Sequence, residues 1–111
     1  MPAVGYEVRL TNGAEQDLET LFDYIAANRS SDDAQKLLDA ILGKTGTLSR
    51  FPERGAVPRE LEALGILDYR QLALPPYRLI YRVAAKKVFI FVIADGRRDM
   101  QALLERRLLG G

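Results

Sequence analysis

The spacing of hydrophobic residues near the start of the chain changes once, and the change predicts a strand followed by a helix. Residues 6–10 alternate apolar and charged side chains, which is the period of a half-buried strand. Asn12 and Glu15 have the spacing of a capping box, so we expect a helix from Asn12 to about Asn28. Its apolar side chains recur at helical spacing, at Leu18, Leu21, Phe22, Ile25 and Ala26.

A second helical stripe follows after a very short connection. Residues 30–33 (SSDD) are candidate N-terminal residues, because hydroxyl and carboxylate oxygens accept hydrogen bonds from the first backbone N–H groups of a helix. The stripe consists of Ala34, Leu37, Leu38, Ile41, Leu42, Thr45 and Leu48, and Pro52 ends it. Since only residues 29–31 join the two helices, we expect an antiparallel hairpin whose shared apolar face needs a sheet to cover it.

The last third of the chain supplies such a sheet. Residues 69–74, 77–84 and 87–94 are rich in β-branched and aromatic side chains and are separated by two-residue breaks, which predicts an antiparallel meander. In the second of these strands, one face is expected to carry Tyr77, Leu79, Tyr81 and Val83, and the other Arg78, Ile80 and Arg82.

The third strand of this meander has a different pattern. Residues 88–93 are all apolar and do not alternate, so we expect a central strand that is covered on both faces. One cover would be the helix hairpin. The other would be a partner protein or a final helix, whose apolar positions are Met100, Leu103, Leu104 and Leu108.

Together these elements predict an α+β fold in the order β-α-α-β-β-β-α. A small, mostly antiparallel sheet would pack on the helix hairpin, with the C-terminal helix at its other side. With 111 residues, 48% of them hydrophobic, the chain is long enough to bury one core, and we expect residues 1–111 to form a single domain.

Composition excludes several kinds of chemistry. The chain has no cysteine, which excludes disulfides, thiolate metal sites and iron–sulfur clusters, and no histidine, which excludes Ser-His-Asp hydrolysis and most zinc enzymes. We therefore expect no cofactor and no metal. No apolar run is long enough to span a bilayer, and residues 1–10 lack the pattern of a secretory signal, so we expect a cytoplasmic protein without a membrane partner.

Charge is distributed unevenly along the chain. Residues 1–68 carry 7 Lys/Arg against 12 Asp/Glu, whereas residues 69–111 carry 9 against 3. An acidic N-terminal part and a basic C-terminal part suggest that the C-terminal part binds an anionic partner, either a nucleic acid or an acidic protein.

Four segments resemble the RelE/ParE superfamily of bacterial toxins. They are residues 50–55 (RFPERG), 69–72 (YRQL), 77–83 (YRLIYRV) and 92–99 (VIADGRRD). The resemblance extends from Tyr6 to about Leu109. It implies the toxin of a type II toxin–antitoxin module that is neutralised by a cognate antitoxin resembling ParD. Its target would be either DNA gyrase or messenger RNA on the ribosome.

The resemblance also assigns positions that RelE-type ribonucleases use for catalysis. Arg70, Arg78 and Arg98 fall at phosphate-binding positions and would be the catalytic residues of a nuclease. Leu72, however, stands where those enzymes have a second lysine, and Leu104 stands where they have a tyrosine. Leucine cannot transfer a proton, and the guanidinium of Arg70 stays charged at ordinary pH, so the ParE branch is favoured.

The expected function is therefore inhibition of DNA gyrase by binding. The expected target-binding residues are Arg70, Arg78, Arg82, Arg97 and Arg98. Two alternatives stay open, namely a RelE-like ribonuclease that cuts messenger RNA on the ribosome, and a non-toxic remnant that only binds its antitoxin. We expect the antitoxin to wrap the toxin with an acidic, amphipathic segment that adds a helix or a strand.

Some of these charged residues also have ordinary structural interpretations. Arg78 and Arg82 would pair with carboxylates of the acidic half, and Arg106 and Arg107 would favour the C-terminus of the last helix. The acidic positions of the first helix are expected to form a solvated face, and they are Glu15, Asp17, Glu19 and Asp23.

Overall fold

The computed structural model describes residues 5–110, so residues 1–4 and 111 of the expected domain lie outside the described range. Its strands are β1 (Glu7–Leu10), β2 (Arg70–Leu74), β3 (Tyr77–Ala84) and β4 (Lys87–Asp95). Its helices are α1 (Asn12–Asn28), α2 (Ser31–Gly46), α3 (Arg59–Glu62) and α4 (Met100–Leu108), and a 3-10 turn, η1 (Thr47–Ser49), follows α2 directly. Among the described residues, no helix is long and apolar enough to cross a membrane.

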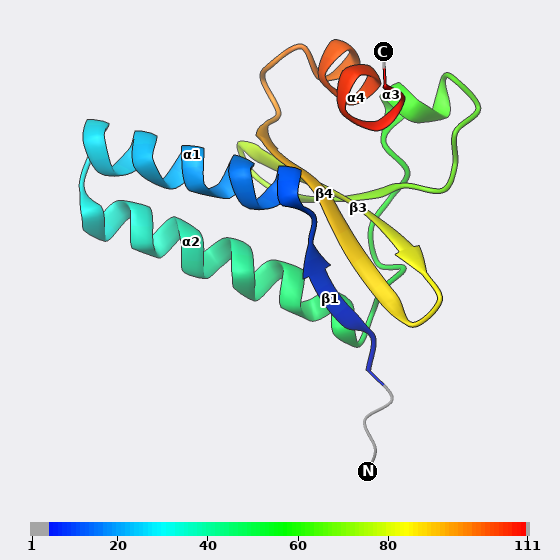
Figure 1. Ribbon diagram of the computed structural model, residues 1–111, viewed down its shortest axis with the longest axis horizontal. Coiled ribbons are helices and arrows are strands. Elements are labelled where there is room, and N and C mark those ends of the chain that lie inside the picture. The colour runs from blue at the N-terminus through cyan, green and yellow to red at the C-terminus, as the bar shows by residue number, and fades with distance from the viewer. Residues whose placement is uncertain (1–4, 111) are drawn as a thin grey trace.

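The four strands form one mixed sheet in the order β1-β4-β3-β2 (Figure 1). Strands β2, β3 and β4 form the predicted antiparallel meander, whereas β1 runs parallel to β4 with Val8 beside Val88. The predicted α+β fold is thus confirmed. Strand β4 is central, as its continuous apolar run predicted.

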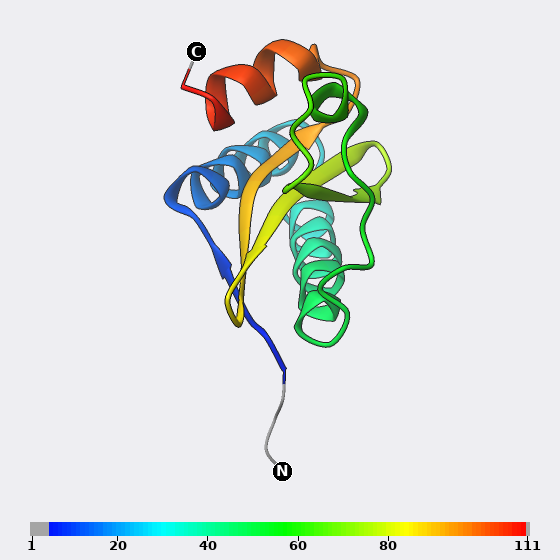
Figure 2. The same cartoon turned by 90° about the vertical axis from the view of Figure 1, so that its right-hand side faces the viewer.

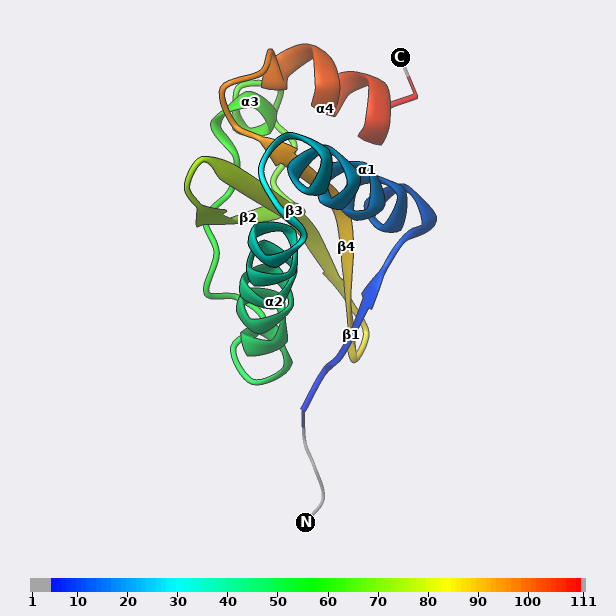
Figure 3. The ribbon, with the colours of Figure 1, turned by 90° about the vertical axis from the view of Figure 1, so that its left-hand side faces the viewer.

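Helices α1 and α2 form the predicted antiparallel hairpin beside the sheet (Figure 3). The hydroxyl of Ser30 caps α2 by accepting a hydrogen bond from the Asp33 N–H at 3.0 Å. The predicted cap of α1 at Asn12 is wrong, because the Thr11 hydroxyl accepts the bond from the Ala14 N–H at 3.2 Å. Thr11 also donates to the carbonyl oxygen of Ile90 at 3.0 Å, so the start of α1 is tied to β4.

The region between the hairpin and the meander holds an element that the sequence analysis missed. Helix α3 has four residues and makes a single turn, which is too short for an apolar period to be recognised. Its anchor is Leu61, which is fully buried, and it packs beside α4 (Figure 2). The second long helix is shorter than predicted, since α2 ends at Gly46 and η1 occupies the last turn before Pro52.

Apolar side chains form two cores, one on each face of the sheet. The core under the hairpin consists of Ala14, Ile41, Leu48, Leu72, Leu79, Tyr81, Val88, Ile90 and Ile93. The core under α3 and α4 consists of Leu61, Tyr69, Ile80, Val92, Ala94, Met100, Leu103 and Leu104. Both covers expected for β4 therefore come from this chain, and the second is the final helix.

One extra residue lies within β4, whose run is apolar throughout because both faces of the strand are covered. Ile80 pairs with Val92, but Tyr81 pairs with Ile90, so Phe91 forms a β-bulge. A one-residue offset reverses the facing of every later side chain in a strand. Accordingly Ile90 lies in the hairpin core and Val92, two residues later, lies in the opposite core.

Candidate functional site

Arg78 lies in a partly buried ion pair. Its guanidinium donates hydrogen bonds to both carboxylate oxygens of Glu60, at 2.7 and 2.8 Å, and to the side-chain oxygen of Gln71 at 2.7 Å. The side chains of Arg78 and Glu60 are 18% and 21% exposed. Since Glu60 belongs to α3 and Gln71 to β2, Arg78 fastens the short helix to the sheet. Its pairing with a carboxylate of the acidic half was one of the two interpretations of this residue.

The electrostatics of this pair leave no free positive charge at Arg78. The hydrogen bonds from Arg78 lower the pKa of Glu60 from 4.5 to about 2, against the opposing effect of burial. The carboxylate is therefore ionised throughout the neutral range and neutralises the guanidinium. A phosphate at this position would have to displace Glu60.

Arg70 holds the loop that precedes α3. Its Nη1 donates to the carbonyl oxygen of Gly55 at 2.6 Å and to that of Glu53 at 3.1 Å. The Gly55 N–H donates in turn to the hydroxyl of Tyr81 at 3.0 Å, and burial raises the pKa of this tyrosine. Gly55 has no space for a side chain, because a Cβ would stand 2.5 Å from the backbone oxygen of Gln71. The loop within residues 50–55, one of the segments that resemble the toxin superfamily, is thus packed around Arg70.

The other three predicted target-binding arginines are exposed. The guanidinium of Arg82 lies 3.4 Å from the carboxylate of Asp68. Arg97 donates to both carboxylate oxygens of Asp95, at 2.9 and 2.6 Å, and these bonds lower the pKa of Asp95 to about 2. Only the backbone of Arg98 is bonded within residues 5–110, through its N–H to the Asp95 carbonyl oxygen at 3.2 Å.

These exposed arginines do not form one patch. Arg97 and Arg98 lie in the turn after β4, next to the end of the sheet where Tyr77 pairs with Asp95. Arg82 lies five residues further along β3. Arg97 and Arg98 are therefore adjacent in one turn, whereas Arg82 lies apart from them on β3.

The five positions of the nuclease comparison are distributed over both faces of the sheet. Leu72 lies in the hairpin core, and Arg70, two residues earlier in β2, projects on the same face. Leu104 lies in the opposite core, and Arg78 bonds on that side to α3. Arg98 lies beyond the end of the sheet. As mapped from the sequence, these positions do not converge on one point.

A second ion pair, between Asp17 of α1 and Arg107 of α4, was missed by the sequence analysis. Arg107 donates to both carboxylate oxygens of Asp17, at 2.9 and 3.1 Å. Strand β1 ends at Leu10, so within residues 5–110 this edge of β4 has no strand neighbour beyond Ile90, and the ion pair bonds its backbone instead. The Ile93 N–H donates to Asp17 at 3.0 Å, and Arg107 donates to the Phe91 carbonyl oxygen at 3.0 Å.

This arrangement corrects two expectations. Asp17 does not belong to a solvated face, since its side chain is only 18% exposed, and Arg107 binds side-chain and backbone groups outside its own helix. The two residues are 90 positions apart, so no local pattern could have paired them. We call this the Asp17–Arg107 clasp.

Removal of the clasp is expected to lower stability. An Asp17→Ala variant leaves the Ile93 N–H and the Arg107 guanidinium without their acceptor in a partly buried place, which should cost about 2 kcal/mol of unfolding free energy. Urea denaturation measures this loss. The control is Glu19→Ala on the exposed side of the same helix, which should change stability by less than about 0.5 kcal/mol. Equal midpoints for Asp17→Ala and the unsubstituted chain would contradict the role of the clasp.

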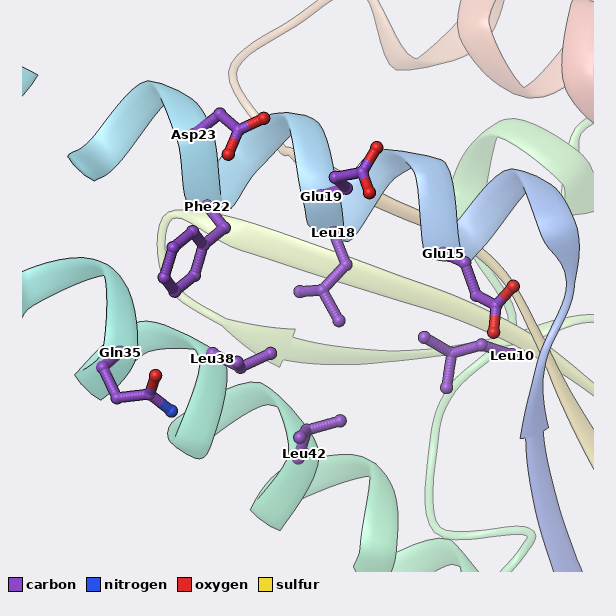
Figure 4. A pocket seen from close by; sticks show the side chains of 9 residues that line it. All are labelled: Leu10, Glu15, Leu18, Glu19, Phe22, Asp23, Gln35, Leu38 and Leu42. Atoms are coloured by element: carbon purple, nitrogen blue, oxygen red, sulfur yellow. The ribbon is translucent and has the colours of Figure 1, made fainter. Parts of the chain in front are cut away.

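An apolar groove of about 720 Å³ runs between α1 and α2. Leu18 and Phe22 project from α1, Leu38 and Leu42 project from α2, and Leu10 closes one end (Figure 4). Leu42 is 46% exposed, so the groove presents apolar side chains to solvent. We call it the hairpin groove.

Acidic side chains border the hairpin groove. Glu15, Glu19 and Asp23 follow one another along α1 beside the apolar residues (Figure 4). All three are exposed, as the sequence predicted for them. The groove therefore combines an apolar floor with a negatively charged rim.

Comparisons with known proteins agree with this architecture. The family model described as "ParE toxin of type II toxin-antitoxin system, parDE" matches residues 8–100. A chain of the chromosomal ParDE toxin–antitoxin system from P. aeruginosa is 21% identical, with a TM-score of 0.69 over 84% of this chain and 98% of that one.

The RelBE2 toxin–antitoxin complex from Mycobacterium tuberculosis contains a second similar chain. It is 27% identical, with a TM-score of 0.54 over 82% of this chain and 98% of that one. A search of the curated proteins finds no match. The resemblance to the RelE/ParE superfamily is confirmed, and because the family model covers most of the sequence, this chain belongs to the ParE toxin family of type II toxin–antitoxin systems.

Proposed function

We propose that this toxin inhibits DNA gyrase by binding to it, without turnover of a substrate, and that a cognate antitoxin neutralises it. Membership of the ParE family supports the toxin assignment. The observation that carries the choice of mechanism is the position of Leu72 and Leu104, which occupy two different cores where a ribonuclease would need proton-transfer groups at one site. The proposed place of action is the cytoplasm.

The arginines divide into two groups in this proposal. Arg70 and Arg78 are engaged by their own chain and hold the loop and helix α3 in place. Arg82, Arg97 and Arg98 are exposed, although Arg82 and Arg97 also pair with Asp68 and Asp95, and the adjacent pair in the turn after β4 is the candidate for contact with the target. Surface guanidinium groups of this kind favour anionic partners.

The hairpin groove is the proposed docking site of the antitoxin. Residues 12–46 carry 7 Asp/Glu against 3 Lys/Arg, so the segment that lies in the groove should be an amphipathic helix with Lys or Arg along its polar edge. This differs from the acidic, amphipathic segment that the charge distribution of the sequence suggested. An acidic part of the antitoxin would instead meet the basic C-terminal half.

The proposed mechanism is tested by two parallel assays. Purified toxin is expected to inhibit supercoiling by gyrase, or to accumulate cleaved DNA, at concentrations at which a reconstituted translation system shows no codon-position cleavage of messenger RNA. The reason is that arginines alone leave proton transfer unassisted, and positioned acid–base groups are worth about 10² to 10⁴ in rate. Cleavage of messenger RNA with unaffected gyrase would establish the RelE-like alternative.

A matched pair of variants separates target binding from loss of folding. Arg98→Ala should weaken gyrase inhibition and leave stability unchanged, since the side chain is exposed. Arg50→Ala, an exposed arginine that follows η1, should change neither property. A chain that binds its antitoxin but affects neither gyrase nor translation would be the non-toxic remnant.

A further inference from the structure

A second cleft, of about 630 Å³, lies between α1 and the end of the sheet where β4 leads into the turn before α4. Tyr24 of α1 and Arg29, which follows the end of α1, lie on one wall. Tyr77, at the start of β3, and the turn residues Arg97 and Arg98 line the other. We call it the arginine–tyrosine cleft. It contains Arg98, the one predicted target-binding arginine whose side chain has no bonding partner within residues 5–110.

The carboxylates in this cleft are already neutralised. Asp17 accepts two hydrogen bonds from Arg107 and one from the Ile93 N–H. Asp95 accepts two from the Arg97 side chain. What remains is the positive charge of Arg98, unpaired among the described residues, and the guanidinium of Arg29, whose side chain is 65% exposed and which lies 3.5 Å from the Asp33 carboxylate in a surface ion pair. The cleft, which is lined by three arginines and two aspartates, therefore has a cationic character.

Aromatic side chains add a second property. Tyr24 is 63% exposed, which is unusual for a large aromatic side chain on a helix that packs against a sheet, and Tyr77 is half-buried. Tyrosine rings beside arginines form the stacking surfaces and the electrostatic attraction that bind single-stranded nucleic acids without sequence preference. An acidic peptide would use the arginines but would gain little from the exposed ring of Tyr24.

We propose that the arginine–tyrosine cleft binds a short stretch of single-stranded nucleic acid, with backbone phosphates at Arg98 and Arg29 and a base against the ring of Tyr24. If the toxin acts on gyrase as proposed, this strand would be DNA held by gyrase. The choice of DNA over RNA rests on the proposed function, whereas binding of a single strand does not. The cleft lies apart from the hairpin groove, and the two share no lining residue. An antitoxin helix in the groove would therefore leave the cleft's own residues uncovered.

The test is fluorescence anisotropy with the purified full-length toxin and a labelled eight-nucleotide strand, as DNA, as RNA and as duplex DNA, at low salt. Binding to the single strand is expected with a Kd in the roughly micromolar range. Two phosphate contacts give a slope of about −1.4 in log K against log salt concentration. Tyr24→Ala should weaken binding by about 5- to 100-fold, because it removes the stacking surface. Arg98→Glu should weaken it at least tenfold and reduce the slope.

The controls distinguish the cleft from general attraction to a polyanion. Arg50→Glu changes the net charge as Arg98→Glu does but lies outside the cleft, and it should bind almost as the unsubstituted chain. Equal losses for these two variants, or unchanged binding by Tyr24→Ala, would overturn the proposal. So would an acidic peptide that competes as well as the strand, or an absence of binding by the single strand.

The outcome is separable from that of the gyrase assay. A toxin that inhibits gyrase and binds no strand refutes the cleft assignment alone. A toxin that binds the strand through Tyr24 and Arg98 but does not inhibit gyrase refutes the proposed target alone. Tighter binding of the RNA strand than of the DNA strand would support the cleft as the binding site and identify its ligand as RNA.

Discussion

An Arg78→Ala variant is expected to lose about 2 to 3 kcal/mol of unfolding free energy. The substitution leaves Glu60 charged and partly buried without its partner, and removal of one member of a buried ion pair is among the costlier single changes. The value is below that of a fully buried pair because both side chains keep some contact with water. Urea denaturation followed by circular dichroism measures the loss, and helix α3 should lose its attachment first.

The matched control is Arg82→Ala on the same strand. This arginine also pairs with a carboxylate, but its side chain is 45% exposed, so its loss should cost less than about 1 kcal/mol. A double variant, Glu60→Gln with Arg78→Met, should recover part of the stability, because it leaves no unpaired charge. Similar stability of the Arg78→Ala and Arg82→Ala variants would show that the Arg78 pair contributes no more than a surface contact.

The pair also predicts how stability depends on pH. The pKa of Glu60 is about 2 in the folded chain, against 4.5 as its ordinary value. Its contribution is therefore fully present above about pH 4.5 and is lost as the pH falls towards 2. A Glu60→Gln variant should show a shallower decline over this interval in the same denaturation experiment.

A Leu42→Asp variant is expected to weaken binding of the cognate antitoxin by about 30- to 100-fold. The substitution places a charge on the apolar floor of the hairpin groove, beside a rim that is already acidic, and desolvating it opposes the docking of a helix. Because Leu42 is 46% exposed, the toxin itself should remain folded. Isothermal titration calorimetry with the purified antitoxin measures the change.

Leu64→Asp is the matched control, since Leu64 is 48% exposed and lies outside the groove. It should bind the antitoxin with unchanged affinity. Glu19→Lys, on the rim, should lower the association rate and its dependence on salt more than it changes dissociation. If Leu42→Asp and Leu64→Asp bind equally well, the antitoxin occupies another surface.

The sequence predicted those parts of the fold that depend on local periodicity. The stripes from Leu18 and from Ala34 located the hairpin, and the continuous apolar run of residues 88–93 identified the central strand. The periodicity of apolar residues could not reveal α3, because a single helical turn contains too few positions to show a period.

The chemistry of the candidate site was less accessible from the sequence, because it depends on pairs of distant residues. Arg78 was expected either to bind the target or to pair with a carboxylate of the acidic half, and only the position of α3 shows that Glu60 lies against it. Asp17 was indistinguishable from its exposed neighbours until the register of β4 placed the Ile93 N–H beside it. An arginine's availability is thus decided by tertiary contacts that a motif does not contain.

The bulge at Phe91 has a consequence for insertions and deletions in this strand. Deleting Phe91 would remove the bulge and leave a regular ladder in which Ile90 still pairs with Tyr81 and Val92 with Ile80, so both cores would keep their residues. Deleting Ile93 instead would keep the bulge and turn Ala94 towards the hairpin. A homologue that lacks only the bulge residue should therefore keep the same residues in both cores, and an alignment that places its gap elsewhere in the strand would match buried residues of one core with those of the other.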